Sequence, residues 1–312
     1  MQGTPPPGVP LAPAQRLLAA PRLAALADAC RHEALSDWSF TNLWLFRTAH
    51  DWRHLDGDWP CLSGRTYDGV RHVFALFPLH EAPSEVLRRL LAGHACFHPL
   101  SQAQVARLDP ELFALEACRD DADYLYPASQ FVHYRGRALR HKRQLMEQLH
   151  ARHRVEILPF APPLRPQAQA VLDGWLRDKG KRPGEADDLP CREALARHEE
   201  LGLAGWLLRA DDEPAGFLLA ETLQPGVDVI RFAKGLARFK GVAQALFQQH
   251  ASAGAGRAGA ALAWLNFEQD LGVPNFRRPK MSYQPAALLP KFRARLRPAR
   301  DGGAPPEAAR HA

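Results

Sequence analysis

The segment from Val229 to Ala243 constrains the fold of this chain more than any other. Its first residues are mostly apolar and β-branched or aromatic, as in a strand, and the residues from Val242 onward have the spacing of a helix. The loop between them is basic and contains glycine. The backbone can therefore approach a ligand closely, and the free amides and the dipole of the helix point at one spot. We expect this loop to bind a pyrophosphate through Arg238, Lys240, Gly241, Val242 and Ala243.

The length of the chain and its proline-rich stretches indicate two lobes. At 312 residues the chain exceeds the usual size of a single core, and its 46% of hydrophobic residues suffice to fill two. A cluster of prolines follows the short strand expected from Val155 to Phe160 and marks the boundary. We expect lobes at 15–155 and 156–297, with disorder in 1–14 and 298–312, which are poor in core-forming residues.

The expected fold class is α/β, of the α+β kind, with a mixed, mostly antiparallel sheet flanked by helices in each lobe. In the first lobe a hairpin spans Cys61 to Leu79 and turns near Asp68-Gly69. The helices of this lobe are expected at 15–31, 83–92, 101–108 and 136–153. In the second lobe we expect helices at 192–201 and 242–251 and strands at 203–209, 215–221, 227–233, 262–266 and 280–283.

The spacing Arg238-x-x-Gly241-x-Ala243 resembles the Arg/Gln-x-x-Gly-x-Gly/Ala signature of GNAT acyltransferases. In that family the loop grips the pyrophosphate of acyl-coenzyme A, so the resemblance implies an acyl-transfer lobe. An ordinary basic turn from strand to helix is the alternative, because the pattern has only three fixed positions.

Several dispersed segments extend the resemblance over most of the chain. They are Ser36 to Arg47, Asp123 to Tyr126, Gly136-Arg137, His141 to Arg143, Asn266 to Gly272 and Lys280 to Pro285. In this order they resemble a bacterial family related to the C-terminal catalytic domain of phosphatidylglycerol lysyltransferases. The resemblance implies two tandem GNAT-like lobes, related in fold to the Fem-type transferases that take an amino acid from aminoacyl-tRNA. Lysyltransferases proper also carry a membrane flippase domain, for which this sequence has no counterpart.

Acyl transfer requires that an amine or a hydroxyl attack an activated ester or thioester, so the site must position the acceptor and stabilise an oxyanion. Lys234, at the end of an expected strand, is a candidate for the oxyanion or a phosphate, with a surface lysine as the alternative. Glu268 and Asp270 are candidates to orient or deprotonate an amine, or else to cap a helix. Tyr283 is a candidate general acid, or else a half-buried strand tyrosine.

Positive charge is concentrated in two segments, although the net charge of the chain is only +6. Residues 134–154 carry +6 and residues 277–300 carry +8, which leaves −8 for the rest of the chain. Such patches attract anionic partners such as tRNA, coenzyme phosphates or lipid head groups, and a solvated helix face is the alternative. If the donor is aminoacyl-tRNA, we expect its phosphates to contact Arg137, Arg140, Lys142 and Arg143.

Other classes of protein are disfavoured by the sequence. No signal peptide and no apolar stretch of about 18 residues is present, so we expect a cytoplasmic protein. Five cysteines at irregular spacing indicate free thiols. The pairs His50-x-x-x-His54 and His94-x-Cys96-x-His98 lack further ligands at a recognisable spacing, so we expect no metal.

The sequence therefore predicts an acyltransferase that moves an aminoacyl group from aminoacyl-tRNA to an amine or hydroxyl acceptor. An acyl-coenzyme A-dependent N-acyltransferase is the first alternative, and a non-catalytic binding protein with a GNAT fold is the second. In each case we expect no tightly bound cofactor. The acceptor is either soluble or reached through a transient contact with a membrane surface.

Overall fold

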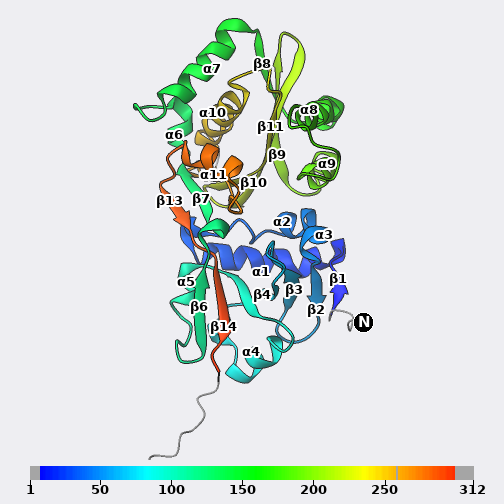
Figure 1. Ribbon diagram of the computed structural model, residues 1–312, viewed down its shortest axis with the longest axis vertical. Coiled ribbons are helices and arrows are strands. Elements are labelled where there is room, and N and C mark those ends of the chain that lie inside the picture. The colour runs from blue at the N-terminus through cyan, green and yellow to red at the C-terminus, as the bar shows by residue number, and fades with distance from the viewer. Residues whose placement is uncertain (1–7, 258, 299–312) are drawn as a thin grey trace, which may run out of the picture.

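The computed structural model describes residues 8–257 and 259–298 and contains two lobes stacked along its long axis (Figure 1). Each lobe is built on a seven-stranded mixed sheet within these residues. The expected disorder at 1–7 and 299–312 lies outside the described residues. Val9–Pro10, which we expected to be disordered, form a short strand.

The sheet of the first lobe has the order β1-β2-β3-β4-β5-β14-β6. Its strands are β1 (Val9–Pro10), β2 (Arg53–Leu55), β3 (Cys61–Arg65), β4 (Arg71–Ala75), β5 (Cys96–Leu100), β6 (Phe113–Ala117) and β14 (Phe292–Leu296). The predicted hairpin is confirmed as β3 and β4, and Gly69 in its turn has a φ of 81°. The helices of this part of the chain are α1 (Arg16–Asp28), α2 (Phe40–Leu45), α3 (Arg47–His50), α4 (Ser84–Leu90) and α5 (Gln102–Val105).

The sheet of the second lobe has the order β13-β7-β12-β11-β10-β9-β8. Its strands are β7 (Asp123–Pro127), β8 (Val155–Pro159), β9 (Leu203–Ala210), β10 (Glu213–Gln224), β11 (Val227–Gly235), β12 (Trp264–Asn266) and β13 (Ala287–Leu289). One face is covered by α8 and α9 and the other by α6, α7 and α10 (Figure 1). These helices are α6 (Ser129–His133), α7 (Arg140–Arg152), α8 (Arg165–Asp178), α9 (Asp188–Ala196) and α10 (Val242–Ala255).

The final strand predicted at Lys280 to Tyr283 is wrong. These residues lie at the end of helix α11 (Pro274–Met281) and in the turn that follows it. Pro274 occupies the first turn of α11, where its missing N–H is not needed and its fixed φ favours a helix. The last strands, β13 and β14, come later in the chain.

The two halves of the chain exchange their last strands. Strands β1 to β7 all lie before residue 155, and strands β8 to β14 begin at residue 155 or later. However, β7 pairs between β12 and β13 in the second sheet, and β14 pairs between β5 and β6 in the first. In the rest of each sheet the arrangement repeats, because a four-stranded antiparallel meander is followed by one parallel pair, β4–β5 or β11–β12. Each sheet therefore takes strands from both sides of the predicted boundary at residue 155.

A continuous apolar core joins the lobes. Helices α1 and α2 lie between the two sheets in Figure 1, and their buried residues Leu23, Leu43 and Trp44 belong to the same cluster as Phe217 and Phe232 of the second sheet. Burial of apolar surface is the main favourable term in folding, so the lobes stabilise one another. The segments that cross from one lobe to the other run through this junction.

Candidate functional site

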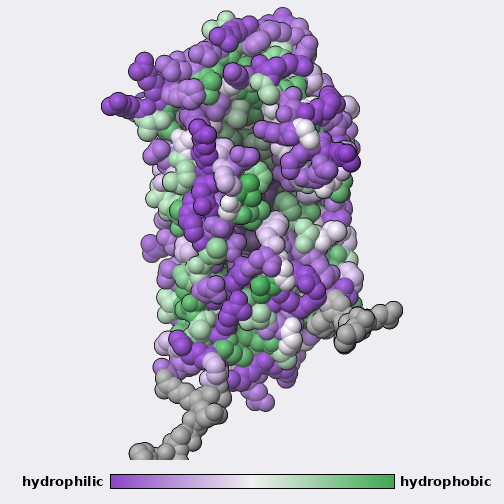
Figure 2. All heavy atoms as spheres, in the orientation of Figure 1, coloured by the Kyte–Doolittle hydropathy of each residue, from purple (hydrophilic) through white to green (hydrophobic). Residues whose placement is uncertain are grey.

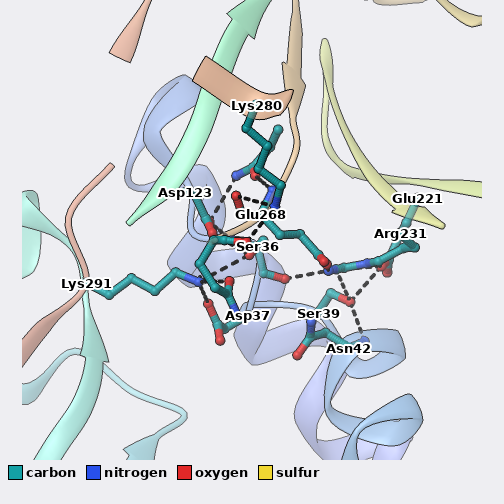
Figure 3. Close-up of polar contacts among 12 residues, drawn as sticks. Ser36, Asp37, Ser39, Asn42, Asp123, Glu221, Arg231, Glu268, Lys280 and Lys291 are labelled. Atoms are coloured by element: carbon teal, nitrogen blue, oxygen red, sulfur yellow. Dashed lines mark hydrogen bonds and ion pairs between the residues drawn. The ribbon is translucent and has the colours of Figure 1, made fainter. Parts of the chain in front are cut away.

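A network of buried and half-buried charged and polar side chains lies at the junction of the lobes (Figure 3). Its members come from segments far apart in the sequence and meet where the exchanged strands cross. They are Ser36, Asp37 and Ser39 before α2, Asp123 at the start of β7, Glu221 in β10, Arg231 in β11, Glu268 after β12, Lys280 in α11 and Lys291 before β14. Figure 2 shows this face of the molecule hollowed near its middle, between α11 and the helices α8 and α9.

Arg231 is the centre of this network and reaches it through a β-bulge. Leu219 pairs with Phe232 and Ala220 pairs with Ile230, so Arg231 is the extra residue on β11. A bulge re-aims the side chain of the extra residue, and bulges are common beside active sites. The buried guanidinium donates to Glu268 at 2.5 Å and forms an ion pair with Glu221 at 2.9 Å.

The segment before α2 supplies further partners to the same guanidinium. Arg231 Nη2 donates to the carbonyl oxygen of Ser36 at 2.9 Å and to Ser39 Oγ at 3.0 Å. Ser39 is the N-cap of α2, where its Oγ accepts from the N–H of Asn42, and it donates to Glu221 at 2.7 Å. The helix cap therefore fixes one wall of the network.

Glu268 and Lys280 are titratable groups shifted toward their neutral forms. Burial raises the pKa of the Glu268 carboxyl above its ordinary value, although Arg231 acts in the opposite direction. Burial also lowers the pKa of the Lys280 ammonium, against the attraction of Glu268. Lys280 Nζ donates to the carbonyl oxygens of Gln269 at 2.5 Å and Glu268 at 3.3 Å. A carboxyl with a raised pKa can accept a proton and return it, which is what general acid–base chemistry requires.

Lys291 connects the two segments that cross between the lobes. Its Nζ lies 2.5 Å from Asp37 Oδ2 and 2.8 Å from Asp123 Oδ1, and 2% of its side chain is exposed. Asp123 also accepts from the N–H and the hydroxyl of Ser36, at 2.7 and 2.9 Å. Burial alone would lower the pKa of Lys291, but the carboxylates of Asp123 and Asp37 raise it above its ordinary value. Lys291 is therefore a fixed positive charge that links Asp37 and Asp123 within the network.

Of the predicted catalytic residues, the structure brings Glu268 into this network and places the others differently. Lys234 lies on the α8 and α9 side of the sheet, where its Nζ donates to Asp187 at 2.7 Å and lies 3.9 Å from the centre of the Trp175 ring. It is a buried, paired lysine rather than a surface one. Its positive charge is already balanced by a carboxylate.

Asp270 is fully buried in a separate cluster of ion pairs. It accepts from Arg119 at 3.0 Å and Arg277 at 2.8 Å, and from the N–H of Gly272 at 2.9 Å. Burial alone would raise the pKa of Asp270, but these hydrogen bonds and that of Tyr124 hold it below its ordinary value. A carboxylate with this many donors is a poor base, and its evident effect is to fix the loop between β12 and α11.

Tyr283 is buried in an aromatic cluster beneath α7, not in a strand. Its hydroxyl accepts from Gln244 Nε2 at 2.7 Å, and Lys142 Nζ lies 4.2 Å from the centre of its ring. Burial raises the pKa of Tyr283 above its ordinary value, which favours the neutral phenol.

The predicted pyrophosphate loop does lead into a helix, and helix α7 packs against it. Gly241 has a φ of 101°, and a Cβ there would overlap the carbonyl oxygen of Leu145 in α7. The N–H of Ala237 donates to the Asp178 carboxylate at 2.7 Å, and Arg238 pairs with Glu213. Lys240 and Ala243 are exposed, and Val242 is buried. The loop thus already contacts two carboxylates, those of Asp178 and Glu213, and the backbone of helix α7.

The two basic segments differ in how far the fold balances their charge. In the run from Arg277 onward, buried and half-buried side chains pair with acids from other segments. These pairs are Arg277 with Asp120 and Asp270, Lys291 with Asp37 and Asp123, Arg293 with Asp68 and Asp121, and Arg295 with Glu116. On α7 and just before it, Arg137 and Arg140 are exposed to solvent, whereas Arg143 lies 3.7 Å from Glu147.

Sequence reasoning missed most of the network. Ser36, Ser39 and Asp123 lie in segments that carry the family resemblance, which was the available signal for them. Arg231 lies in the middle of an expected strand, and nothing in the sequence reveals the bulge that turns its side chain inward. Lys280 begins another of these segments but was given no role, and Lys291 was counted only as part of a basic run.

Two further properties concern the described residues as a whole. No helix in 8–257 or 259–298 is long and apolar enough to cross a membrane. In the same ranges, no group of three or more His, Cys, Asp or Glu side chains is arranged to hold a metal ion.

The comparisons with known proteins agree with the observed architecture. A family model described as "Phosphatidylglycerol lysyltransferase, C-terminal" matches residues 30–295. A conserved protein of unknown function from Bacteroides thetaiotaomicron VPI-5482 has a similar structure, with a TM-score of 0.75 and 21% identity over 92% of this chain and 98% of that chain. No curated protein matches this chain at a significant level.

Two other solved structures are similar over nearly their whole length. L-PGS from Bacillus licheniformis has a TM-score of 0.58 and 14% identity, over 94% of each chain. FemX has a TM-score of 0.54 and 8% identity, over 90% of this chain and 96% of that chain. Identities this low show the fold alone. That fold is the expected one, with two tandem GNAT-like lobes of the mixed α/β class.

Proposed function

Because the chain belongs to the family described as phosphatidylglycerol lysyltransferase, C-terminal, we propose that it transfers an aminoacyl group from aminoacyl-tRNA to an amine or hydroxyl acceptor. The donor is consumed in each turnover, so no tightly bound cofactor is required. Charged tRNA is a cytoplasmic substrate, and we place the reaction in the cytoplasm. An acceptor in a membrane would be reached by transient contact with the surface.

The packing of α7 on the loop before α10 is the observation that carries this choice of donor. In the coenzyme A-dependent reading, a pyrophosphate occupies that loop. Here Gly241 is in contact with the backbone of Leu145, and the carboxylate of Asp178 accepts from a loop amide. Helix α7 instead presents Arg140 to solvent, with Arg137 just before it. A cationic surface of this kind suits the phosphates of a nucleic acid.

The buried network supplies the chemistry. Glu268, with its raised pKa, takes a proton from the acceptor as that group attacks the ester carbonyl, and returns it to the ribose oxygen of the tRNA as the ester bond to that oxygen breaks. Lys280 provides positive charge for the oxyanion that develops, and Arg231 holds Glu268 in place. Arg231 is buried and Glu268 and Lys280 are half-buried, and electrostatic stabilisation is stronger in such surroundings than in water. The roles predicted for Lys234, Asp270 and Tyr283 stay predictions, since each is held by other partners.

A coenzyme A-dependent transfer is the second candidate, and one observation favours it. Gly241 is the N-cap of the 14-residue helix α10, at the end of the loop that follows β11, as the GNAT signature requires. Displacement of α7 would expose that helix end to a phosphate.

Salt-dependent binding tests the donor. We expect fluorescently labelled tRNA to bind with an affinity that falls steeply as salt rises. The double variant Arg137→Glu with Arg140→Glu should weaken binding about tenfold or more and reduce the salt slope by about two, because two phosphate contacts are lost. The matched control is Arg88→Glu with Arg89→Glu, which makes the same charge change on α4.

A single-turnover assay tests the reaction. The protein is mixed with bulk tRNA charged with labelled amino acids and with pooled amine and hydroxyl acceptors, and loss of the ester is followed. Glu268→Gln should slow transfer by about 10² to 10⁴-fold. Tight binding of acetyl-coenzyme A with no tRNA binding would favour the second candidate. Binding of tRNA without consumption of any ester would favour a non-catalytic protein.

A further inference from the structure

A small cavity opens on the first-lobe side of the network and has a lining unlike that of the network itself. It has a volume of about 30 Å³, comparable to the space of one water molecule. Three histidines, His50, His72 and His98, line it, and Lys291 and Gln269 connect it to the network. The reaction proposed above gives these three histidines no role.

The three imidazoles share one hydrogen-bonding arrangement. In each ring Nδ1 faces a backbone carbonyl oxygen, that of Arg65 at 2.7 Å for His50 and that of Phe292 at 3.2 Å for His98. His72 makes a longer contact of the same kind, at 3.5 Å, with Val70. A carbonyl can only accept, so Nδ1 carries the hydrogen. Each Nε2 is therefore left as an acceptor.

The charges around the cavity also favour a ligand that donates hydrogen bonds and carries positive charge. Burial lowers the pKa of all three histidines, to about 4 for His98, so the rings are neutral near pH 7. The carboxylates of Asp37 and Asp121 belong to the lining. The lining's one cationic side chain, Lys291, is already paired with Asp37 and Asp123 and donates to Gln269. Arg293, outside the lining, pairs with Asp121 and Asp68, so four carboxylates surround two cations here. An anion would find an excess of lone pairs and carboxylates here.

We propose that this cavity binds the primary ammonium group of the acceptor, so that the acceptor is an amine. The inference rests on the proposed function, since it names the acceptor of that reaction. A primary ammonium has three N–H donors and one positive charge, which match several acceptors and a surplus of negative charge. A hydroxyl has one hydrogen and no charge. The half-exposed ring of Tyr67 lines the cavity and contacts His50, and its face can receive a cation.

The same imidazoles suit the chemistry of an amine. An ammonium cannot attack an ester, because its nitrogen has no free electron pair. One proton must therefore pass to solvent before attack, and the imidazoles, which burial keeps neutral, then accept hydrogen bonds from the N–H groups of the neutral amine. The amine is then held beside Lys291 and Gln269, at the edge of the network that contains Glu268.

Binding of methylammonium chloride to the full-length protein tests the proposal. Imidazole nitrogen shifts are followed by two-bond proton–nitrogen correlation spectra of ¹⁵N-labelled protein. We expect saturable shifts at His50, His72 and His98 and none at His94, whose Nε2 is already bonded to Ser63. His50→Gln should weaken binding about tenfold, the value of one hydrogen bond of about 1.4 kcal/mol, and His94→Gln should leave it unchanged.

Two other probes show whether the cavity recognises the positive charge of the ligand, its N–H groups, or an anion instead. Tetramethylammonium has the charge but no N–H group, and sodium phosphate is an anion. Absence of saturable shifts with methylammonium, or equal shifts with either of these probes, would overturn the proposal. Transfer to a hydroxyl compound alone would overturn it and leave the proposed function intact. Methylammonium binding without consumption of any charged tRNA would refute the proposed function and leave an amine site.

Discussion

At the scale of single residues, the site depends on charges that have almost no contact with solvent. Lys291 is 2% exposed and Asp123 is fully buried, and the side chain of Arg231 is also fully buried. A buried charge is stable only while its partner is present, because the cost of removing it from water is large. The same groups that would act on a substrate therefore also hold the lobes together.

Lys291→Met should lower the free energy of unfolding by about 3 to 5 kcal/mol, because Asp37 and Asp123 would remain buried without their partner. Urea denaturation followed by fluorescence measures the change. Arg295→Met is the matched control, since Arg295 pairs with Glu116 at 3.5 Å while both side chains remain partly exposed to solvent, and the pair should contribute less than about 1 kcal/mol. Equal effects of the two substitutions would contradict the assignment of Lys291 as a buried link.

His98 should make the protein less stable in acid. Its pKa is lowered from 6.5 to about 4 in the folded state, first by burial, so the unfolded chain binds the proton more readily. Stability is then complete above pH 6.5 and declines as the pH falls from about 6.5 to about 4, by roughly 3 kcal/mol. Urea denaturation at pH 7, 5.5 and 4.5 should show a smaller decline for His98→Gln. An unchanged slope in this variant, relative to the exposed control His141→Gln, would refute the assignment.

The residues of the network could be predicted only in part. Glu268 is recognisable because an acid directly after a strand is a common position for a functional side chain, and the structure does place it in the network. Arg231 is not recognisable, because its inward direction arises from a bulge set by pairing with β10. The pairing of Lys234 with Asp187 joins residues 47 positions apart, which spacing alone cannot reveal.

At the scale of elements, the contact between α7 and the loop before α10 is the basis for choosing between the two candidate donors. The sequence predicts both elements, and both are confirmed within a few residues. Their contact depends on the absence of a side chain at Gly241. A glycine that resembles a ligand-binding position therefore also serves helix packing.

Gly241→Ala should be more destabilising than an alanine at a comparable glycine. Its φ of 101° is strained for alanine, and its Cβ would overlap the backbone of Leu145. We expect a loss of about 3 kcal/mol or more in the free energy of unfolding. Gly69→Ala has a similar φ of 81° but no atom within 4 Å, so it should cost only about 1 kcal/mol. Similar losses in urea denaturation would show that α7 does not pack tightly on the loop.

Whether a segment forms a helix or a strand was easier to predict than which strands pair with one another. The meander β9 to β11 follows from alternating and apolar runs separated by turns, and it is confirmed. The strand predicted at Lys280 to Tyr283 failed because Pro274 begins a helix whose last residues overlap that range. The insertion of β7 and β14 into the opposite sheets could not be predicted, because a short strand pattern does not specify its neighbours.

At the scale of the whole molecule, the strand exchange makes the two lobes one folding unit. Each sheet contains one strand from the other half, and Lys291 and Asp123 join the crossing segments at 2.8 Å. Movement of one lobe relative to the other would strain the segments that cross between the sheets and the ion pairs that join them. The crossing segments and their ion pairs hold the charges of the site in fixed positions, which favours a preorganised arrangement.

Neither half of the chain should fold alone. Residues 1–154 lack β14, and residues 155–312 lack β7, so each fragment would leave a gap between two strands of its sheet. Thermal unfolding followed by circular dichroism should show one cooperative transition for the intact chain and none for either fragment. Mixing the fragments should restore a transition. A cooperative transition in one isolated fragment would show that the exchanged strand is dispensable.

The exchange also sets the order of events during biosynthesis. The first sheet has a gap between β5 and β6 until Phe292–Leu296 has left the ribosome, so the first half cannot complete its fold while the rest is being made. Lys291 emerges at the same stage, and without it Asp37 and Asp123 have no partner. A nascent chain interrupted before this point would hold neither a closed sheet nor an assembled site, and would be a substrate for chaperones and proteases.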